Sequence, residues 1–469
     1  MVRAVMADKK TMAVNEASAE YSLGVMDLCP HGYKQTEVGV IPDDWDVSEI
    51  RDLSRTGSGT TPSRSQHERY FNNGRHHWVK TTDLNNSIIS DTEEKVTAYA
   101  LSETCLQVYP PDTVLVAMYG GFNQIGRTGI LNISAAVNQA LIAIVANKNQ
   151  INPKLLISWL NYRVLEWKKV ASSSRKDPNI TSNDVKCFKV AYPNSLVEQE
   201  SIARALSDVN ELIVSLEKLI AKKRDIKTAT MQQLLTGKKR LPGFGQGKGY
   251  KQTELGEIPE DWDVRALGAV GNTYGGLTGK SKSDFGTGTG KYVTFLNVMM
   301  NVVINPALFE EVKVSPSEPQ NKVLKGDLLF NGSSETPEEV AMCSLVADEV
   351  ANLYLNSFCF GFRLFYGVEI DRLFLVYYLR SNVGREMMKS LAQGSTRYNL
   401  SKASLLESNI YLPLLNEQET IASVLSDMDA EITTQEVRCN KTKAIKQGMM
   451  QELLTGRTRL IKHGDNTNG

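Results

Sequence analysis

The sequence has little of three things: cysteine, long apolar runs and net charge. Its six cysteines are spread over 469 residues and form no Cys-x-x-Cys pair. This argues against a disulfide framework or a zinc site and favours a reduced, cytoplasmic compartment. The longest apolar runs, such as Leu373–Leu379, are far shorter than the roughly 20 residues of a transmembrane helix. Residues 1–31 also lack the continuous apolar core of a secretory signal, so no membrane association is expected.

The charges balance, with 53 lysines and arginines against 53 aspartates and glutamates. Net charge therefore gives no sign of a polyanionic partner, and any basic surface must be local. Hydrophobic residues (41%) and charged residues (23%) occur as in a folded globular protein. At roughly 150 residues per domain, the length suggests about three domains.

An internal repeat is the strongest signal. The segment Gly32–Val47 (GYKQTEVGVIPDDWDV) returns as Gly249–Val264 (GYKQTELGEIPEDWDV), with 13 of 16 positions identical at an offset of 217. Two further matches recur at an offset of 219. The first is Glu-Gln-Glu followed by Leu-Ser-Asp, and the second is Leu-Leu-Thr-Gly. A period this long indicates a duplicated domain plus a duplicated connector rather than a solenoid. The stretches between these motifs match poorly, so the scaffold repeats while the domains differ.

Each connector is predicted to be a long helix. Residues 198–236 contain neither Pro nor Gly, and Gly237 is a candidate C-cap. At 1.5 Å per residue, such a helix is about 58 Å long. Apolar residues recur with heptad spacing. The seam comprises Leu206, Val209, Ile213, Leu216 and Ile220 in the first helix and Leu425, Met428 and Ile432 in the second, where Ile421 and Ile445 also fit.

These patterns predict an α+β protein. Two mixed α/β domains would be joined by two long helices that form an antiparallel coiled coil, with a pseudo-twofold internal repeat. Mutual packing of the helices would place the domains at opposite ends. The alternative is that each helix buries its apolar stripe on its own domain. Strands are expected at 114–118, 140–145, 328–330 and 358–365, and short helices within 153–170 and 371–391.

Motifs for catalysis and metal binding are weak or missing. The segment Tyr274–Ser281 resembles a P-loop, but its first glycine is one residue too close to the second. The sequence has no Asn-Pro-Pro-aromatic or Asp-Pro-Pro-aromatic motif, His-Glu-x-x-His or Gly-x-Ser-x-Gly. His67, His76 and His77 lack partners at metal-ligand spacing. No catalytic residue and no metal site are predicted.

Polar, glycine-containing loops beside the predicted strands offer a different chemistry. Such loops occur in both variable stretches, for example 119–127 and 394–398. Arg, Lys, Asn and Gln match the edges of bases, and Ser, Thr and backbone amides match phosphates. Any one of these could be an ordinary solvated loop, but their recurrence in both halves favours nucleic-acid binding.

The motif order, spacing and duplication over about residues 32–460 closely resemble the specificity subunit of type I restriction–modification systems. The openers at Gly32 and Gly249 resemble the start of that family's domains. The Glu-Gln-Glu, Leu-Ser-Asp and Leu-Leu-Thr-Gly segments resemble its shared helices.

The resemblance implies two target-recognition domains, each binding one half of a bipartite site in double-stranded DNA. The helices would set the spacer and dock two methyltransferase subunits, which methylate adenine with S-adenosylmethionine. Two motor–nuclease subunits using ATP and Mg²⁺ would complete the restriction complex. The chain itself would be a non-catalytic, cytoplasmic protein without a cofactor.

Positions in the loops give a set of candidate DNA contacts. They are Lys80, Thr82, Asn123, Gln124, Arg127, Arg175 and Lys176 in the first domain and Lys280, Lys282, Asn297, Ser333, Arg397 and Tyr398 in the second.

The repeat also gives domain boundaries. They are an N-terminal extension (1–31), a first recognition domain (32–197), a central helix (198–240), a linker with the second recognition domain (241–415), a C-terminal helix (416–460) and a tail (461–469).

Two functions from other classes stay open at this point. One is a coiled-coil interaction scaffold that does not bind DNA, and the other is a self-contained DNA-modifying enzyme. The sequence lacks the Asn-Pro-Pro-aromatic or Asp-Pro-Pro-aromatic motif of enzymes that methylate amines, which argues against a self-contained DNA-modifying enzyme.

Overall fold

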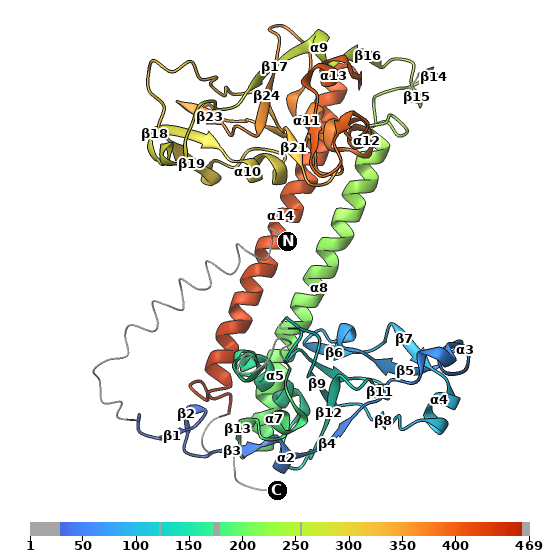
Figure 1. Cartoon of the computed structure of the whole chain (residues 1–469), viewed down its shortest axis with the longest axis vertical. Coiled ribbons are helices and arrows are strands. Elements are labelled where there is room, and N and C mark those ends of the chain that lie inside the picture. The colour runs from blue at the N-terminus through green and yellow to red at the C-terminus, as the bar shows by residue number, and fades with distance from the viewer. Residues whose placement is uncertain (1–28, 122, 172–178, 254–255, 462–469) are drawn as a thin grey trace. The chain divides into compact units, whose positions relative to one another are not determined.

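The computed structural model describes residues 29–121, 123–171, 179–253 and 256–461 (Figure 1). The chain divides into two compact units. The first comprises residues 1–215 and 439–469, and the second comprises residues 216–438. Each unit contains one globular domain and one half of each of two long helices, α8 (Leu196–Leu234) and α14 (Leu415–Leu453).

The first domain is built on two sheets, with strand orders β4-β12-β9-β10-β6 and β7-β5-β11-β8. The hairpin β1-β2 and the antiparallel pair β3-β13 complete it. Its strands are β1 (Tyr33–Thr36), β2 (Gly39–Pro42), β3 (Trp45–Glu49), β4 (Ser54–Ser58), β5 (His76–Val79), β6 (Ser87–Ile89), β7 (Glu94–Val96), β8 (Val108–Tyr109), β9 (Val114–Ala117), β10 (Thr128–Leu131), β11 (Ala135–Val137), β12 (Leu141–Ala146) and β13 (Lys189–Pro193). Its helices are α2 (Ile50–Leu53), α3 (His67–Tyr70), α4 (Ala98–Glu103), α5 (Pro153–Tyr162), α6 (Val164–Ala171) and α7 (Ser182–Lys186).

The second domain is built on three sheets, with strand orders β17-β24-β20-β22, β19-β18-β23 and β21-β26-β25, and the hairpin β14-β15 and the antiparallel pair β16-β27 complete it. Its strands are β14 (Tyr250–Thr253), β15 (Gly256–Pro259), β16 (Asp263–Ala266), β17 (Gly271–Gly275), β18 (Phe285–Val293), β19 (Phe309–Val312), β20 (Leu328–Asn331), β21 (Ser333–Ser334), β22 (Cys343–Leu345), β23 (Leu353–Leu355), β24 (Cys359–Leu364), β25 (Ala392–Gln393), β26 (Tyr398–Leu400) and β27 (Asn409–Leu412). Its helices are α9 (Leu267–Val270), α10 (Phe295–Met300), α11 (Arg372–Arg380), α12 (Asn382–Leu391) and α13 (Lys402–Glu407).

The two domains share a strand framework although their sequences differ. The antiparallel order β4-β12-β9 in the first corresponds to β17-β24-β20 in the second. The parallel pair β5-β11 corresponds to β18-β23, and the pair β3-β13 corresponds to β16-β27. The predicted mixed α/β domains are confirmed, and the variable stretches prove to be two versions of one fold.

Helix starts follow local sequence rules. Asn152 caps α5, where its side chain accepts hydrogen bonds from two backbone N–H groups and Pro153 occupies the first turn. Asp371 caps α11 in the same way through the N–H of Phe374. Both predicted helical regions are therefore present. Each is split into two helices, α5 with α6 and α11 with α12.

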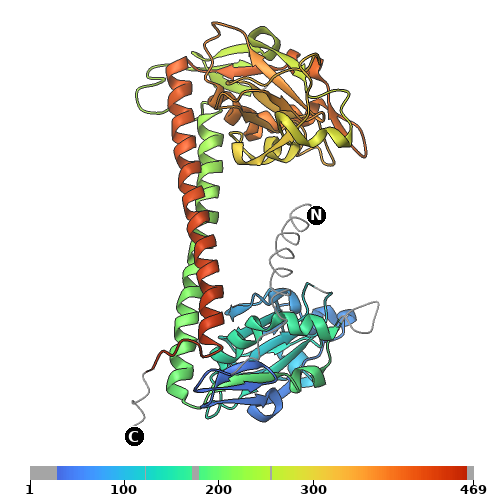
Figure 2. The same cartoon turned by 90° about the vertical axis from the view of Figure 1, so that its left-hand side faces the viewer.

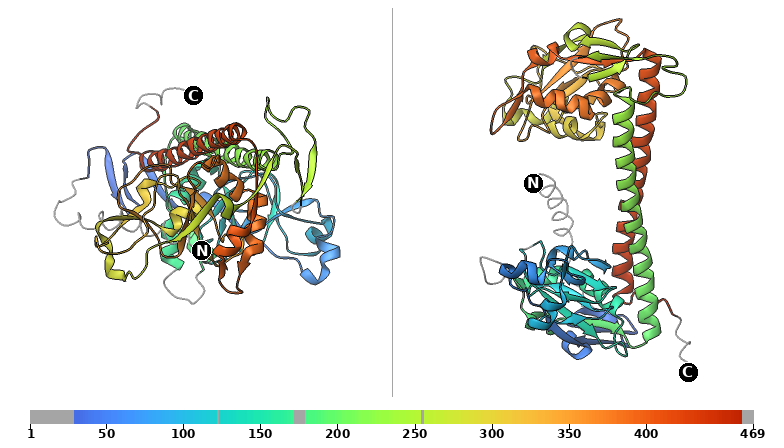
Figure 3. Two further views of the ribbon diagram at one scale, coloured as in Figure 1. Left: turned by 90° about the horizontal axis from the view of Figure 1, so that it is seen from above. Right: turned by 90° about the vertical axis from the view of Figure 1, so that its right-hand side faces the viewer.

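The long helices are antiparallel neighbours within each unit (Figure 2, Figure 3). In the second unit, Lys223 on α8 pairs with Glu431 on α14, and Lys227 pairs with Asp429. Partner numbers fall as α8 numbers rise, which is the pattern of an antiparallel pair. In the first unit, Lys446 of α14 donates to Asn210 of α8.

The predicted seam is buried, but it has two kinds of partner. Ile213, Leu216, Ile220 and Ile432 are each no more than 7% exposed, and Val209 and Met428 are half-buried. Nearer the start of each helix, the seam residue packs on a domain instead of on the other helix. Leu206 belongs to the core of the first domain and Leu425 to that of the second. Both predicted modes of packing are therefore present, in different parts of the helices.

The prediction for Ile445 is wrong, because half of its surface is exposed.

Each long helix ends on a repeated hairpin motif, in a contact we call the helix-end junction. In the first unit, Leu453 and Leu454 at the end of α14 share a core with Trp45. The hydroxyl of Tyr33 donates to the carbonyl of Gly456 (3.1 Å). Gly456 has a φ of +68°, and a Cβ there would lie 2.4 Å from Pro42. Only glycine suits this position, because the backbone is left-handed and the proline ring leaves no space.

An arginine completes the junction. Arg459 donates two hydrogen bonds to Asp44 (2.9 and 2.8 Å) and two to Glu198 (2.5 and 2.7 Å). Glu198 is 1% exposed, so it depends on this guanidinium for charge compensation. The hydrogen bonds to both carboxylates raise the pKa of Arg459, which therefore stays charged.

The second unit repeats this junction at the end of α8. Arg240 forms the same paired hydrogen bonds with Asp261 and Glu417. Tyr250 donates to the carbonyl of Gly237, and a Cβ on Gly237 would lie 2.4 Å from Pro259. The predicted C-cap at Gly237 is confirmed by its φ of +69°.

The structure lacks two other features within the residues that it describes. No helix there is long and apolar enough to span a bilayer. No group of three or more His, Cys, Asp or Glu side chains there is arranged to hold a metal ion.

Replacing Leu216 with Asp should destabilise the paired helices, because it removes a buried leucine and places a carboxylate in the seam. We expect a loss of about 3 kcal/mol or more, measured by urea unfolding followed by circular dichroism. The matched control is Leu219→Asp, since Leu219 lies on the same helix and is 39% exposed. Equal stability of the two variants would contradict the packing described here.

Replacing Arg459 with Ala should leave the buried Glu198 without compensation. We expect the first unit to lose roughly 3 kcal/mol, the lower end for a broken buried pair, because Arg459 keeps some exposure. The control is the exposed Arg457→Ala, two residues earlier. Thermal unfolding of both variants measures the difference, and a similar melting temperature for the two would count against the junction.

Candidate nucleic-acid interface

An arginine–aromatic group marks one edge of the second domain. Arg397 precedes β26, and its guanidinium lies 5.3 Å from the ring centre of Phe358. Its Nε donates to the hydroxyl of Ser333 (3.3 Å). Phe358, in the turn between β23 and β24, is 57% exposed. Lys402 lies over the ring of Phe360, two residues further on. We call Ser333, Phe358, Arg397 and Lys402 the Arg397 cluster.

The Arg397 cluster has unused hydrogen-bond donors. Among the described residues, Arg397 donates a side-chain hydrogen bond only through Nε, so the N–H groups of its two terminal nitrogens are available to a ligand. An exposed aromatic face beside a guanidinium suits stacking on a base. An arginine with four remaining N–H groups also suits the acceptor edge of guanine. Tyr398, the next residue, is half-buried and packs against the core of its domain.

The first domain has a loop of different composition at the corresponding strand end. The loop of residues 118–127 follows β9, the counterpart of β20, which leads to Ser333. Ile125 is 1% exposed and anchors the loop in the core, and Gly126 (φ +74°) lies against Trp167. Asn123 is exposed, while Gln124 and Arg127 are half-buried. One strand end therefore carries amides and an arginine in one domain and the buried Ser333 and Ser334 in the other.

Lys80 and Thr82 lie beyond β5 in surroundings that differ. Lys80 contacts Glu93 (2.8 Å) and Glu94 (2.7 Å), and its side chain is 18% exposed. Burial alone would lower the pKa of Lys80, but the hydrogen bonds to both glutamates outweigh it and the pKa is raised. Its charge is thus already matched by carboxylates. Thr82 is exposed and stays a candidate contact.

The structure corrects one prediction in the second domain and weakens another. Asn297 is fully buried, and its amide bonds with Asn301 and with the backbone of Asn305, so it is closed to DNA and orders the end of α10. Lys280 is 6% exposed and pairs with Glu318, which points to a structural role. Lys282 is exposed and stays a candidate. Arg175 and Lys176 lie outside the described residues.

The P-loop-like segment does not form a phosphate loop. β17 ends at Gly275, and a 3-10 turn of residues 282–284 follows where a P-loop requires a helix. The ammonium of Lys280, the lysine of the motif, is held by Glu318 and by the carbonyl of Lys313.

Comparisons with known proteins agree with this architecture. The family model described as the type I restriction modification DNA specificity domain matches residues 42–227 and 259–440. These two stretches cover most of the chain. The chain belongs to the type I restriction–modification DNA specificity family.

This chain matches curated specificity subunits over nearly the full length of both sequences. The MjaX type I restriction enzyme specificity subunit of Methanocaldococcus jannaschii is 26% identical over 447 residues, covering 91% of this chain and 97% of that protein. The MjaVIII specificity subunit of the same organism is 27% identical over 434 residues, covering 90% and 94%. The crystal structure of a type I S subunit from M. genitalium has the same fold, with a TM-score of 0.55, 14% identity, and coverage of 87% of this chain and 96% of that chain. DNA target recognition is thus the role of this specificity subunit.

Some residues of the candidate interface were not predicted from the sequence. Phe358 was expected only as the first residue of a strand, and Lys402 was not singled out. Arg64 stacks on Phe71 (4.4 Å) and lies near Trp78 (5.3 Å). Phe358 follows the turn residues Asn356 and Ser357, and an aromatic residue in a turn is the only local signal that could have found it, since its contact with Arg397 is tertiary.

Replacing Arg397 with Ala should weaken binding of the specific DNA by about 1–3 kcal/mol and relax one part of the target only. A mobility-shift series with the methyltransferase partner present, on cognate and singly changed duplexes, measures this. The control is Arg265→Ala, an exposed arginine on β16. An equal loss on all sequences would mean that Arg397 contacts phosphate instead.

Proposed function

We propose that each domain of this specificity subunit reads one part of a bipartite DNA target. Three observations support the proposal. The two domains share a strand framework, each is held by the same helix-end junction, and the loops at equivalent strand ends differ in chemistry. Two similar scaffolds with different loops suit two different base sequences.

The long helices would set the distance between the two parts of the target and dock two methyltransferase subunits. Thirty-nine residues correspond to about 58 Å of helix. Apolar side chains such as Leu212, Leu219 and Ile226 are each at least 39% exposed on α8. Exposed apolar residues along one helix favour a protein partner.

Catalysis would come from other subunits. The methyltransferase subunits would use S-adenosylmethionine to methylate adenine, and two motor–nuclease subunits would use ATP and Mg²⁺ to cut unmodified DNA. The zero net charge of the chain fits this division. Proteins that neutralise few phosphates bind DNA weakly, so the partner subunits would supply most of the phosphate contacts.

The most direct test is to sequence methylated adenines, position by position, in DNA from cells expressing this chain with its methyltransferase partner. We expect one target with two specified parts and an unspecified spacer of fixed length. Methylation at a single short sequence would contradict the bipartite proposal. Methylation that does not depend on this chain would favour a scaffold without DNA recognition.

A further inference from the structure

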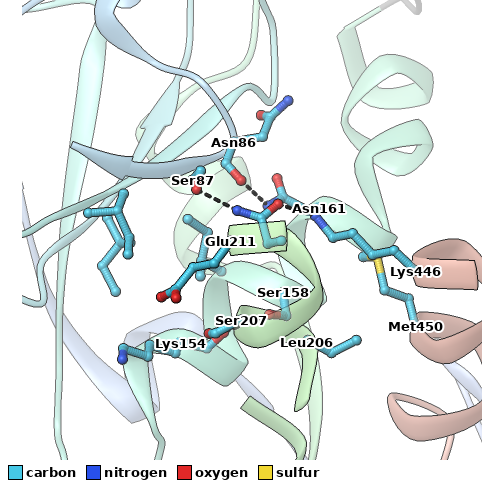
Figure 4. Close-up of a pocket in the computed structure, with 14 residues that line it drawn as sticks. Asn86, Ser87, Lys154, Ser158, Asn161, Leu206, Ser207, Glu211, Lys446 and Met450 are labelled. Atoms are coloured by element: carbon cyan, nitrogen blue, oxygen red, sulfur yellow. Dashed lines mark hydrogen bonds between the residues drawn. The ribbon is translucent and has the colours of Figure 1, made fainter. Parts of the chain in front are cut away.

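A small cavity lies in the first unit where the domain meets the two long helices (Figure 4). Its volume is about 60 Å³. The strand β6 and the loop before it form one wall, α5 another, and α8 and α14 the rest. The lining is mixed. Ile88, Ile130, Ile157, Leu206 and Met450 form its apolar part, and three serines and three asparagines lie beside Lys154, Glu211 and Lys446.

Lys446 is the central charged group of this cavity. Its ammonium donates to the side-chain oxygen of Asn210 (2.6 Å), and the amide nitrogen of Asn210 donates to the hydroxyl of Ser87 (2.7 Å). Among the described residues, this neutral amide is the only polar partner of Lys446. Burial lowers the pKa of Lys446. A partly buried ammonium with only a neutral partner is a costly arrangement.

In the second unit, the lysine at the equivalent position has a charged partner. With the repeat offset of 219, Lys446 corresponds to Lys227, and Asn210 corresponds to Asp429. Lys227 pairs with Asp429 (2.5 Å), which also accepts a hydrogen bond from the hydroxyl of Tyr377 (2.7 Å). The ring of Tyr377 lies 5.3 Å from the Lys227 ammonium, where the first unit has the smaller Ser158. The first unit thus has neither the carboxylate nor the ring.

Several donors remain for a ligand in the cavity. Asn210 uses one of the three N–H groups of Lys446, and Ser87 accepts a hydrogen bond but keeps its own proton. Ser207 also lines the cavity and makes no hydrogen bond through its hydroxyl within the described part of the chain. The one acidic lining residue is Glu211, whose carboxylate lies on the side of Lys154, away from the Lys446 ammonium (Figure 4).

We propose that this cavity binds a small free anion, a carboxylate or a phosphate, whose charge is met by Lys446. The volume is about four times that needed by one water, which suits a group the size of acetate or phosphate. The bound anion would compensate the charge of Lys446, as the Asp429 carboxylate does for Lys227 in the second unit, and would use the space that the ring of Tyr377 fills there. This inference concerns the first unit alone and does not depend on the proposed function.

Isothermal titration of the full-length chain with acetate and with inorganic phosphate, at constant ionic strength, tests the proposal. We expect saturable binding of at least one of them, and the one that binds identifies the class. Lys446→Met should weaken this binding at least tenfold. The exposed Lys441→Met on the same helix is the control and should bind as the original chain does.

Asn210→Asp keeps the test decisive even if Lys446→Met unfolds. This change supplies the carboxylate that Asp429 provides in the second unit, so it should raise the melting temperature and abolish anion binding. Absence of saturable binding to the original chain would overturn the proposal. So would equal binding by the original chain and Asn210→Asp, since it would place the anion elsewhere.

Discussion

The structure depends on the way each long helix ends. At the end of α14, one guanidinium bridges a hairpin carboxylate and a buried carboxylate at the start of α8. A left-handed glycine beside it lies against proline and tryptophan rings. The same set of contacts closes the end of α8 in the second unit. Because the charges and the glycine geometry permit few alternatives, each domain has a fixed attachment to the helices.

This attachment explains why the repeat is strong in some segments and weak in others. The hairpin, the glutamate at the helix start and the Leu-Leu-Thr-Gly-x-x-Arg helix end form the junctions, so they recur almost unchanged. Residues between the junctions need only preserve the strand framework. The loops that leave this framework are free to differ, as residues 118–127 and the Arg397 cluster do. A constant frame with variable loops suits a protein that recognises different sequences at two sites.

The sequence predicted the fold better than the interface. Heptad spacing and the glycine after each helix predicted α8 and α14 closely, because these signals are local, and the absence of Pro and Gly gave α8 further support. The division of the seam between helix and domain was not predictable, since Leu206 and Leu425 have the same apolar character as the residues that face the partner helix.

Side-chain availability was also hidden from the sequence. Lys280 and Asn297 are residue types that often bind DNA. However, Lys280 is paired with Glu318, 38 residues away, and Asn297 is hydrogen-bonded to Asn301 and Asn305. Which polar residue is already paired depends on tertiary contacts, and loop position alone does not report them. The cavity at Lys446 became visible only when the two units could be compared residue by residue.

The central claim is that two unlike reading domains occupy equivalent places in one frame. Replacing residues 50–188 with residues 267–408 would give a chain with the same domain in both places, and sequencing of its methylated DNA with the methyltransferase partner tests the claim directly. The account predicts a target whose two parts are copies of one sequence, the part now read by the second domain. Methylation that still requires two different parts would contradict it.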